Sequence, residues 1–180
     1  MLAAFYFSMN LQSDDFTLFG LPQQFAQDER LVDVRRKALQ QEAHPDMFAA
    51  HGPAAQRLAM QWSVRINEAF QRLRDPLRRA AYLCELRGFP VQAERNTAMP
   101  AKFLVQQMEW REALDDAVSA EALETIDQQV VASRSTLLTE VAYALDIDND
   151  AAAATHQVRS LMFIERFAAD VHARIDQLAV

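Results

Sequence analysis

The sequence predicts an all-α protein built from two helical regions and a short linker. Hydrophobic residues make up 51% of the 180 residues and only 3 residues are glycine. Alanine, leucine, glutamine, glutamate and arginine are frequent, and these residues favour helix over sheet. Apolar residues also recur at helical spacing along most of the chain. The composition therefore supports a sizeable helical core and argues against wholesale disorder.

The first helical region is expected over residues 14–88. After a short apolar segment at 16–21, Asp28 is placed to cap a helix that begins near Glu29 and ends by Ala43. Its apolar residues recur at helical spacing: Leu31, Val34, Ala38 and Leu39. The segment His44-Pro45-Asp46 must break this helix, because a proline in a helix interior removes a hydrogen bond and clashes with the preceding turn.

Two more helices complete this region. A long one is predicted from about Ala54 to Arg72, and Asp75-Pro76 interrupts the pattern before another helix at Leu77–Arg87, which Gly88 closes. The long helix carries a single apolar stripe: Leu58, Trp62, Ile66, Ala69, Phe70 and Leu73.

Residues 89–100 contain two prolines and little periodicity, so they are predicted to form the linker. Three helices follow at about 101–117, 121–146 and 151–178. Their short connections favour an antiparallel three-helix bundle over residues 101–180.

Charge is distributed unevenly between the two regions. Residues 14–88 hold 11 basic and 10 acidic side chains, whereas residues 89–180 hold 7 and 15. This asymmetry suggests two different partners, and the acidic second region argues against binding of nucleic acid.

The chain has no uncharged apolar run of 18 residues and no basic segment before its apolar start, so neither a membrane span nor a signal peptide is expected. Met9 is an alternative start, which would make residues 1–8 an extension. The single cysteine, Cys84, is expected to be a small buried apolar residue, and it fits a reducing, cytoplasmic setting.

The tripeptide His44-Pro45-Asp46 stands between a basic helix and a long apolar-striped helix. Three motifs follow it in order: Ile66-Asn67-Glu68-Ala69-Phe70, Leu73-Arg74-Asp75-Pro76 and Arg78-Arg79-Ala80-Ala81-Tyr82. Together with the opening Phe16 to Pro22, this set resembles the J-domain family over residues 14–88. The resemblance implies a helical hairpin whose loop carries the tripeptide.

The second region is similar to one branch of that family, HscB. The resemblance is carried by Leu83 to Pro90, Phe103-Leu104, Met108 to Glu112 and Val158 to Phe163. It implies a co-chaperone of iron–sulfur cluster biogenesis that binds an HscA-type ATPase of the heat-shock-70 class and delivers an IscU-type scaffold protein to it. The alternative is a J-domain co-chaperone of a general DnaK chaperone with broader clients.

Three residues depart from the J-domain pattern. Ala43 stands where an aromatic residue usually precedes the tripeptide, Arg36 stands where the family has a second aromatic residue, and Met47 replaces a basic residue. The departures affect packing or docking around the loop and leave the tripeptide intact.

The resemblance assigns chaperone binding to His44, Pro45 and Asp46 and to the neighbouring cations Arg35, Arg36 and Lys37. Pro45 would make the loop rigid, and Asp46 could pair with basic groups. Three cations within one turn raise the rate of association with an acidic partner, although each exposed pair contributes only ~0.2–1 kcal/mol. Without the tripeptide, the same charges would be interpreted as a solvated helix face.

The first helix of the bundle carries more apolar surface than a bundle needs. Taking Phe103 as the origin, Trp110, Leu114 and Ala117 fall within about 40° of it, and these four residues predict the core stripe. A second strip, Leu104, Val105 and Met108 with Glu109 and Glu112, falls at about 100–240°. Periodicity leaves open whether this strip is a partner surface or extra packing. The resemblance favours scaffold binding, with Phe163 of the last helix either on the same surface or packed at its edge.

The sequence suggests no enzyme. It contains no nucleophile–base pair, no GxxxxGK[ST] loop and no HExxH motif, and no second ligand stands at suitable spacing from His44. We therefore expect a binding adaptor without cofactor or metal that activates the ATPase of a partner.

Overall fold

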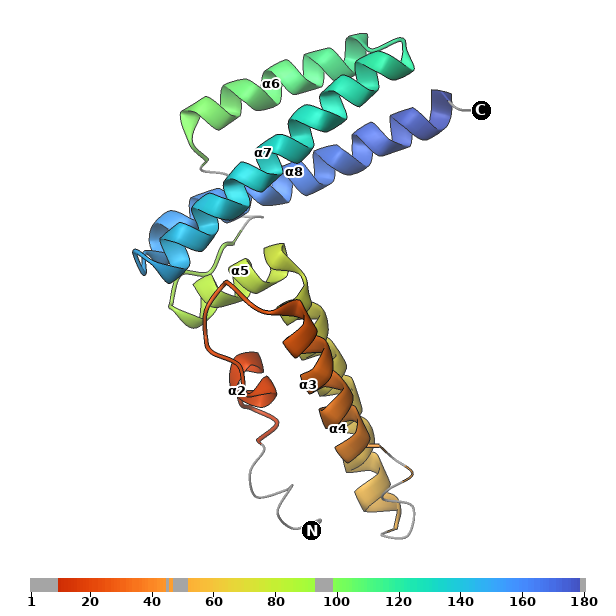
Figure 1. Ribbon diagram of the computed structural model, residues 1–180, viewed down its shortest axis with the longest axis vertical. Helices are drawn as coiled ribbons and strands as arrows, with labels where there is room; N and C mark the ends of the chain where they lie inside the picture. The colour runs from red at the N-terminus through yellow and green to blue at the C-terminus, as the bar shows by residue number, and fades with distance from the viewer. Residues whose placement is uncertain (1–9, 45, 47–51, 93–98, 179–180) are drawn as a thin grey trace. The chain divides into compact units, whose positions relative to one another are not determined.

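The computed structural model describes residues 10–44, 46, 52–92 and 99–178, and over these residues it is helical without strands (Figure 1). The all-α prediction is confirmed. The chain divides into two compact units, residues 1–79 and 80–180. The predicted linker, 89–100, falls in the second unit, and its residues 93–98 lie outside the described part, as do residues 1–9. No described helix has the length and apolar character to cross a membrane.

The first unit is a helical hairpin with a short helix against it. The hairpin consists of α3 (Glu29–Glu42) and α4 (Pro53–Arg74), and α2 (Asp15–Phe19) packs on both (Figure 1). The sequence pattern missed α2, because five residues are too short for a periodicity. Its ends are nevertheless well defined by Asp14, which accepts a hydrogen bond from the Thr17 N–H at 3.0 Å, and by Gly20.

Gly20 ends α2 in a left-handed conformation with φ of 60°. Its N–H donates to the Thr17 carbonyl and the Leu21 N–H donates to the Phe16 carbonyl, the pattern of a Schellman cap. A residue with a side chain would be strained at this φ, so glycine lets the chain turn from α2 toward α3.

The buried face of α3 differs from the predicted one. Val32 is the buried residue of this helix, whereas Leu31 is 39% and Val34 is 60% exposed. The half-buried Arg36 lies one turn beyond Val32 and shares its face. The apolar spacing was misleading because an arginine occupies a core-facing position, whereas Leu31, Val34 and Ala38 are exposed.

The apolar stripe predicted on α4 is confirmed. Five of its residues are buried and Leu58 is half-buried; the five are Trp62, Ile66, Ala69, Phe70 and Leu73. Asp75 ends α4 and caps α5 (Pro76–Leu86), since its carboxylate accepts a hydrogen bond from the Arg78 N–H at 2.8 Å. Gly88, with φ of 84°, closes α5 as predicted.

The second unit holds a bundle of α6 (Ala101–Asp116), α7 (Ala120–Asp146) and α8 (Ala151–Leu178), each within one residue of its predicted ends (Figure 1). Two arginines fasten the chain that follows α5 to this bundle. Arg87 donates from Nη1 to the Leu145 carbonyl at 2.6 Å, and the buried Arg159 donates from Nε to the Val91 carbonyl at 3.0 Å. The bundle therefore includes part of the segment that the sequence suggested was a linker.

Candidate functional site

The loop after α3 presents two polar side chains to solvent. The side chain of His44 is 58% exposed and that of Asp46 is 91% exposed. The Asp46 N–H donates to Nδ1 of His44 at 3.3 Å, and the Asp46 carboxylate lies 3.6 Å from the same nitrogen. Pro45, predicted to make the loop rigid, lies outside the described residues, as does Met47. The described part of the tripeptide thus exposes both of its polar side chains to solvent.

The loop is anchored at its start by α4. Ala43 is fully buried, and its carbonyl accepts a hydrogen bond from the Ser63 hydroxyl at 3.3 Å. The same hydroxyl lies 3.0 Å from the Ala59 carbonyl on α4. A large ring is absent at position 43, and a small residue packed against α4 holds the backbone instead. Ala43 therefore leaves the start of the loop well supported.

The three cations of α3 have different environments. Arg35 and Lys37 are exposed. Arg36 is half-buried, its guanidinium carbon lies 4.3 Å from the centre of the Phe70 ring, and its Nε has no hydrogen-bond partner among the described residues. An arginine stacked on an aromatic ring packs as a flat group and keeps its charge. Arg36 therefore packs against α4 from the position where the J-domain pattern has an aromatic residue.

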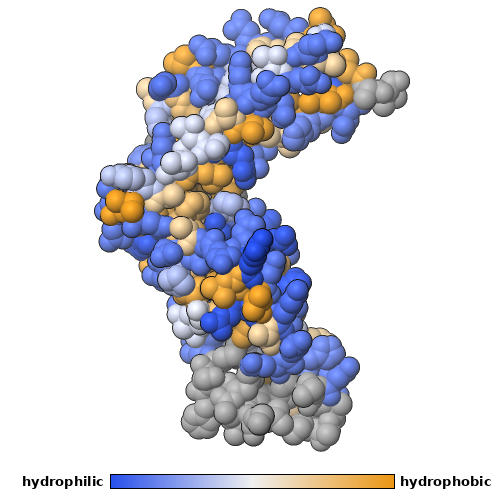
Figure 2. Space-filling model, in the orientation of Figure 1, coloured by the Kyte–Doolittle hydropathy of each residue, from blue (hydrophilic) through white to orange (hydrophobic). Residues whose placement is uncertain are grey.

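An apolar surface accompanies these cations. Leu31 and Val34 are exposed on α3, and Figure 2 shows hydrophobic surface beside strongly hydrophilic surface over this helix. The sequence pattern assigned both residues to an amphipathic stripe. Their exposure adds an apolar element to the charged face that the tripeptide loop adjoins.

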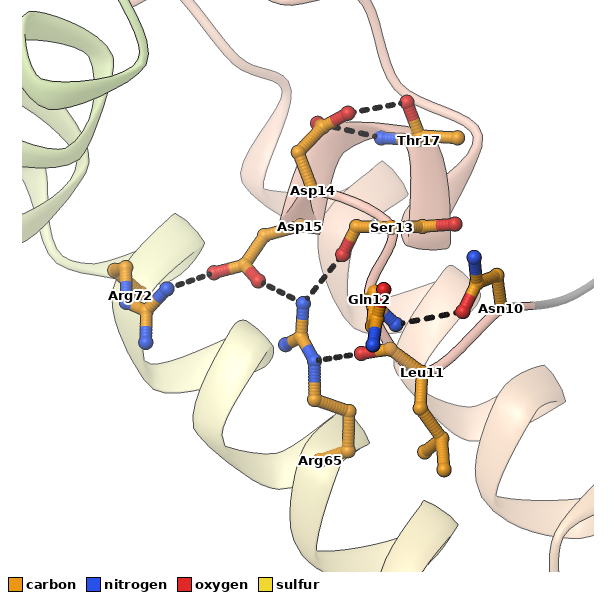
Figure 3. Close-up of polar contacts among 9 residues, drawn as sticks. All are labelled: Asn10, Leu11, Gln12, Ser13, Asp14, Asp15, Thr17, Arg65 and Arg72. Atoms are coloured by element: carbon orange, nitrogen blue, oxygen red, sulfur yellow. Dashed lines mark hydrogen bonds and ion pairs between the residues drawn. The ribbon is translucent and has the colours of Figure 1, made fainter.

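A buried carboxylate that sequence reasoning missed connects α2 to α4 (Figure 3). Asp15 is fully buried, and its two oxygens lie 2.6 Å from Nη2 of Arg65 and 3.0 Å from Nη1 of Arg72. Arg65 also donates to the carbonyls of Leu11 and Ser13. The buried charge is thus paired on both oxygens, as the low dielectric of a core requires. We refer to Asp15, Arg65 and Arg72 as the carboxylate clamp.

The second apolar strip of α6 is exposed, as its helical angle predicts. Leu104 is 42%, Val105 56% and Met108 72% exposed. Glu109 and Glu112 are exposed as well. Core packing against the bundle therefore does not account for this strip.

Phe163 belongs to a cluster of rings, and the guanidinium carbon of Arg111 on α6 lies 5.4 Å from the centre of its ring. Its ring is 5.8 Å from that of Phe103 and 5.9 Å from that of Phe167, which in turn stacks on Trp110 at 5.6 Å. Phe103 and Trp110 meet edge to face at 6.4 Å. These four rings, the aromatic cluster, join α6 to α8. The half-buried Phe163 is therefore a packing residue whatever else it contacts.

Cys84 is unsuited to nucleophilic or metal chemistry. Burial raises the pKa of its thiol to about 11, against the opposing influence of Arg87 and Arg159. Within the described ranges no three His, Cys, Asp or Glu side chains converge where they could hold a metal ion. The features that stand out are two exposed surfaces of different chemistry.

Comparison with known proteins identifies the family to which this chain belongs. Residues 99–172 match the family described as the HSCB C-terminal oligomerisation domain. The co-chaperone protein HscB homolog of Burkholderia multivorans is 48% identical over 173 residues, which cover 94% of this chain and 98% of the relative. The chain belongs to the HscB co-chaperone family. Its members are co-chaperones.

Solved HscB structures agree with this assignment. The chaperone HscB from Vibrio cholerae is 36% identical and superposes with a TM-score of 0.79, covering 92% of this chain and 99% of that one. The human co-chaperone HscB superposes with a TM-score of 0.82 at 24% identity, over 96% of this chain and 85% of that one, which supports the fold alone. The predicted J-domain followed by a three-helix bundle is thereby confirmed as the HscB fold.

Proposed function

We propose that this protein stimulates the ATPase of an HscA-type chaperone through its tripeptide loop and α3, and delivers an IscU-type scaffold that binds α6. The observation that carries the proposal is the pair of exposed surfaces, one polar and cationic in the first unit and one apolar with an acidic edge in the second. Stimulation would take place in the cytoplasm, in keeping with a single cysteine that is free and buried.

The chaperone surface comprises His44, Pro45 and Asp46 with Arg35, Arg36 and Lys37. His44 and Asp46 are exposed and mutually oriented by the hydrogen bond between them. Arg35 and Lys37 supply positive potential that guides an acidic partner. Arg36 acts mainly by positioning α3, because its cation–π contact holds this helix against Phe70 of α4.

The scaffold surface comprises Leu104, Val105 and Met108 with Glu109 and Glu112, bordered by Phe163. Apolar side chains exposed this far provide burial energy on binding, about 25 cal/mol for each Å² removed from water. Methionine adapts its shape to a partner. The carboxylates favour a basic partner surface and thus select one scaffold over many clients.

The direct test measures steady-state ATP hydrolysis by the HscA-type chaperone with this protein, with and without the scaffold. We expect the protein to raise the rate, and to raise it further when scaffold is present. His44→Gln should abolish most of the stimulation, while Gln41→Ala, an exposed α3 change, should preserve it. Equal stimulation by His44→Gln and the wild type would remove the loop from the mechanism.

The scaffold arm is tested by titration with the purified IscU-type protein. Leu104→Ala combined with Met108→Ala should weaken binding at least tenfold and leave the helical content unchanged. Phe163 is better left intact, since its replacement would also loosen the aromatic cluster. Unchanged affinity would eliminate the α6 surface.

A pull-down separates this proposal from a general DnaK co-chaperone. Enrichment of one scaffold protein favours the specific adaptor. Enrichment of many unfolded clients, with stimulation of DnaK equal to that of the HscA-type protein, favours the general one.

A further inference from the structure

A groove runs between α6 and α7, beside the proposed scaffold surface. Its volume is about 700 Å³, within the range of about 300–1,000 Å³ typical of ligand sites. The residues that line it come from both helices: Lys102, Val105, Gln106 and Glu109 from α6, and Gln129, Ala132, Ser133 and Thr136 from α7.

The groove has a structural origin on both sides. The aromatic cluster fastens α6 to α8 through Phe103 and Trp110, and the flank of α6 that faces the groove lies about 100° around the helix from these rings. On α7 the facing residues Ala132 and Ser133 are too small to fill the space. The groove therefore forms because large rings pack α6 against α8, whereas small side chains of α7 face the neighbouring flank of α6.

The groove continues the apolar strip of α6. Val105, which is 56% exposed, and the exposed Glu109 belong to both surfaces. Helical geometry turns them about 100° from Leu104 and Met108, toward α7. A partner that covers the strip therefore reaches the mouth of the groove without a break.

We propose that an extended segment of the basic scaffold partner occupies this groove, with an apolar side chain against Val105 and Ala132 and a cationic one near Glu109. This inference rests on the proposed scaffold function and enlarges its footprint from α6 to α7. Charge supports a cationic side chain at Glu109, because residues 89–180 carry 15 acidic and 7 basic side chains and this carboxylate lines the groove. Lys102 is the other charged residue of the lining, and it lies about two helical turns from Glu109 on α6, so it directs the cation of the partner to the Glu109 end. The amide and hydroxyl groups of Gln106, Ser133 and Thr136 suit the backbone of a peptide.

The test fills the groove without altering α6. Ala132→Trp places a large ring in it, and Val131→Trp places the same ring on the neighbouring α7 position, which is 57% exposed and outside the groove. Thr136→Trp is a second filling variant in case the first disturbs α7. We expect Ala132→Trp and Thr136→Trp to weaken scaffold binding at least tenfold in calorimetric titration, and Val131→Trp to change it less than twofold. Circular dichroism of each variant monitors the bundle.

The outcomes distinguish this inference from the function on which it rests. If the filling variants are folded and bind as the wild type does, while Leu104→Ala with Met108→Ala loses binding, the groove is empty in the complex and the inference is wrong. If no variant changes binding, the scaffold function itself fails. A change in the sedimentation of the protein alone on filling the groove would assign it to contacts between two copies of this chain, which also overturns the inference.

Glu109→Gln tests the position of the cationic side chain. We expect this variant to weaken scaffold binding severalfold at low salt and to reduce the salt dependence of the affinity. Glu124→Gln, an exposed change on α7 outside the groove, is the matched control. Equal salt dependence in both variants would place the cationic contact elsewhere and contradict the proposed orientation.

Discussion

The two units fasten their helices by different means. In the first unit the carboxylate clamp ties α2 to α4, Arg36 lies over Phe70, and the guanidinium carbon of Arg79 lies 5.1 Å from the centre of the Phe25 ring. In the second, four stacked and edge-to-face rings hold α6. In the first unit charged side chains both attach the helices to one another and form most of the proposed binding surface. In the second unit apolar side chains have both parts. The two binding surfaces should therefore respond to different variables.

Each unit carries one tryptophan that reports on it. Trp62 of α4 and Trp110 of α6 are both 3% exposed, and the chain has no other tryptophan. Variants in which one of them is phenylalanine allow the unfolding of each unit to be followed by fluorescence. This separation matters because a chain with two units need not unfold in one step.

The largest expected effect comes from the aromatic cluster. Phe167→Ala removes a ring that is 1% exposed and stacks on both Trp110 and Phe163. The free energy of unfolding of the second unit should fall by about 3–5 kcal/mol, the usual cost of emptying a phenylalanine site. Urea titration with Trp110 as reporter measures it. The exposed Tyr143→Ala is the control, and a loss below about 1 kcal/mol would mean that the cluster contributes little.

The carboxylate clamp is expected to give the next largest effect, confined to the first unit. Asp15→Ala leaves Arg65 without its buried partner and should lower stability by about 3 kcal/mol, near the lower end of the range for broken buried pairs because Arg72 is 39% exposed. Urea titration with Trp62 as reporter tests this, and Asp33→Ala is the matched control. A variant as stable as the wild type would show that the attraction between the charges of the clamp only offsets the free-energy cost of removing them from water.

Salt should separate the two binding surfaces. Raising the salt concentration from about 0.01 to 0.15 M shortens the screening length from about 30 to 8 Å, so we expect chaperone affinity to fall about tenfold. Scaffold affinity should fall less and show a larger negative heat-capacity change, since apolar burial dominates it. Calorimetry at several salt concentrations and temperatures compares them. An equal salt dependence of the two affinities would contradict the assignment of a charged binding surface to the first unit and an apolar one to the second.

The smallest expected effect is the cap of α2. Partial burial tends to raise the pKa of Asp14, but hydrogen bonds from the Thr17 hydroxyl and N–H outweigh it and hold the pKa below its ordinary value of 3.8. The lowered pKa means that this group stabilises the fold at pH above 3.8 and ceases to do so as the pH falls through its folded-state pKa. Asp14→Ala should cost about 1 kcal/mol at neutral pH. The difference from the wild type should shrink in acid, and a constant difference would assign it to packing.

Periodicity was enough for the long helices and for the two faces of α6. It works there because a stripe such as Phe103, Trp110 and Leu114 repeats over several turns. It failed for α3, where Arg36 packs inward and Val34 faces outward. The hydropathy of an arginine does not show that its flat guanidinium can stack on a ring, so the buried face was misassigned.

The carboxylate clamp could not be predicted from local patterns at all. Asp15 and Arg65 are 50 positions apart in the chain, and neither residue type suggests burial by itself. The adjacent Asp14 and Asp15 look alike in sequence, yet one caps a helix at the surface and the other is fully buried. The sequence alone does not decide between the two places for Phe163, because a helical angle gives the direction of a side chain and not how far a large ring extends.

The buried thiol of Cys84 has a practical consequence. Cys84 is the sole cysteine of the chain. Because the pKa of its thiol is about 11, little thiolate is present at neutral pH, and Cys84 reacts slowly with electrophilic thiol reagents. A cysteine introduced at an exposed position outside the proposed binding surfaces, such as Gln41 or Val131, would thus be modified selectively in the otherwise native chain. Fluorophores attached at those two positions would report chaperone and scaffold engagement in a single reaction mixture, and would reveal the order in which the partners arrive and leave.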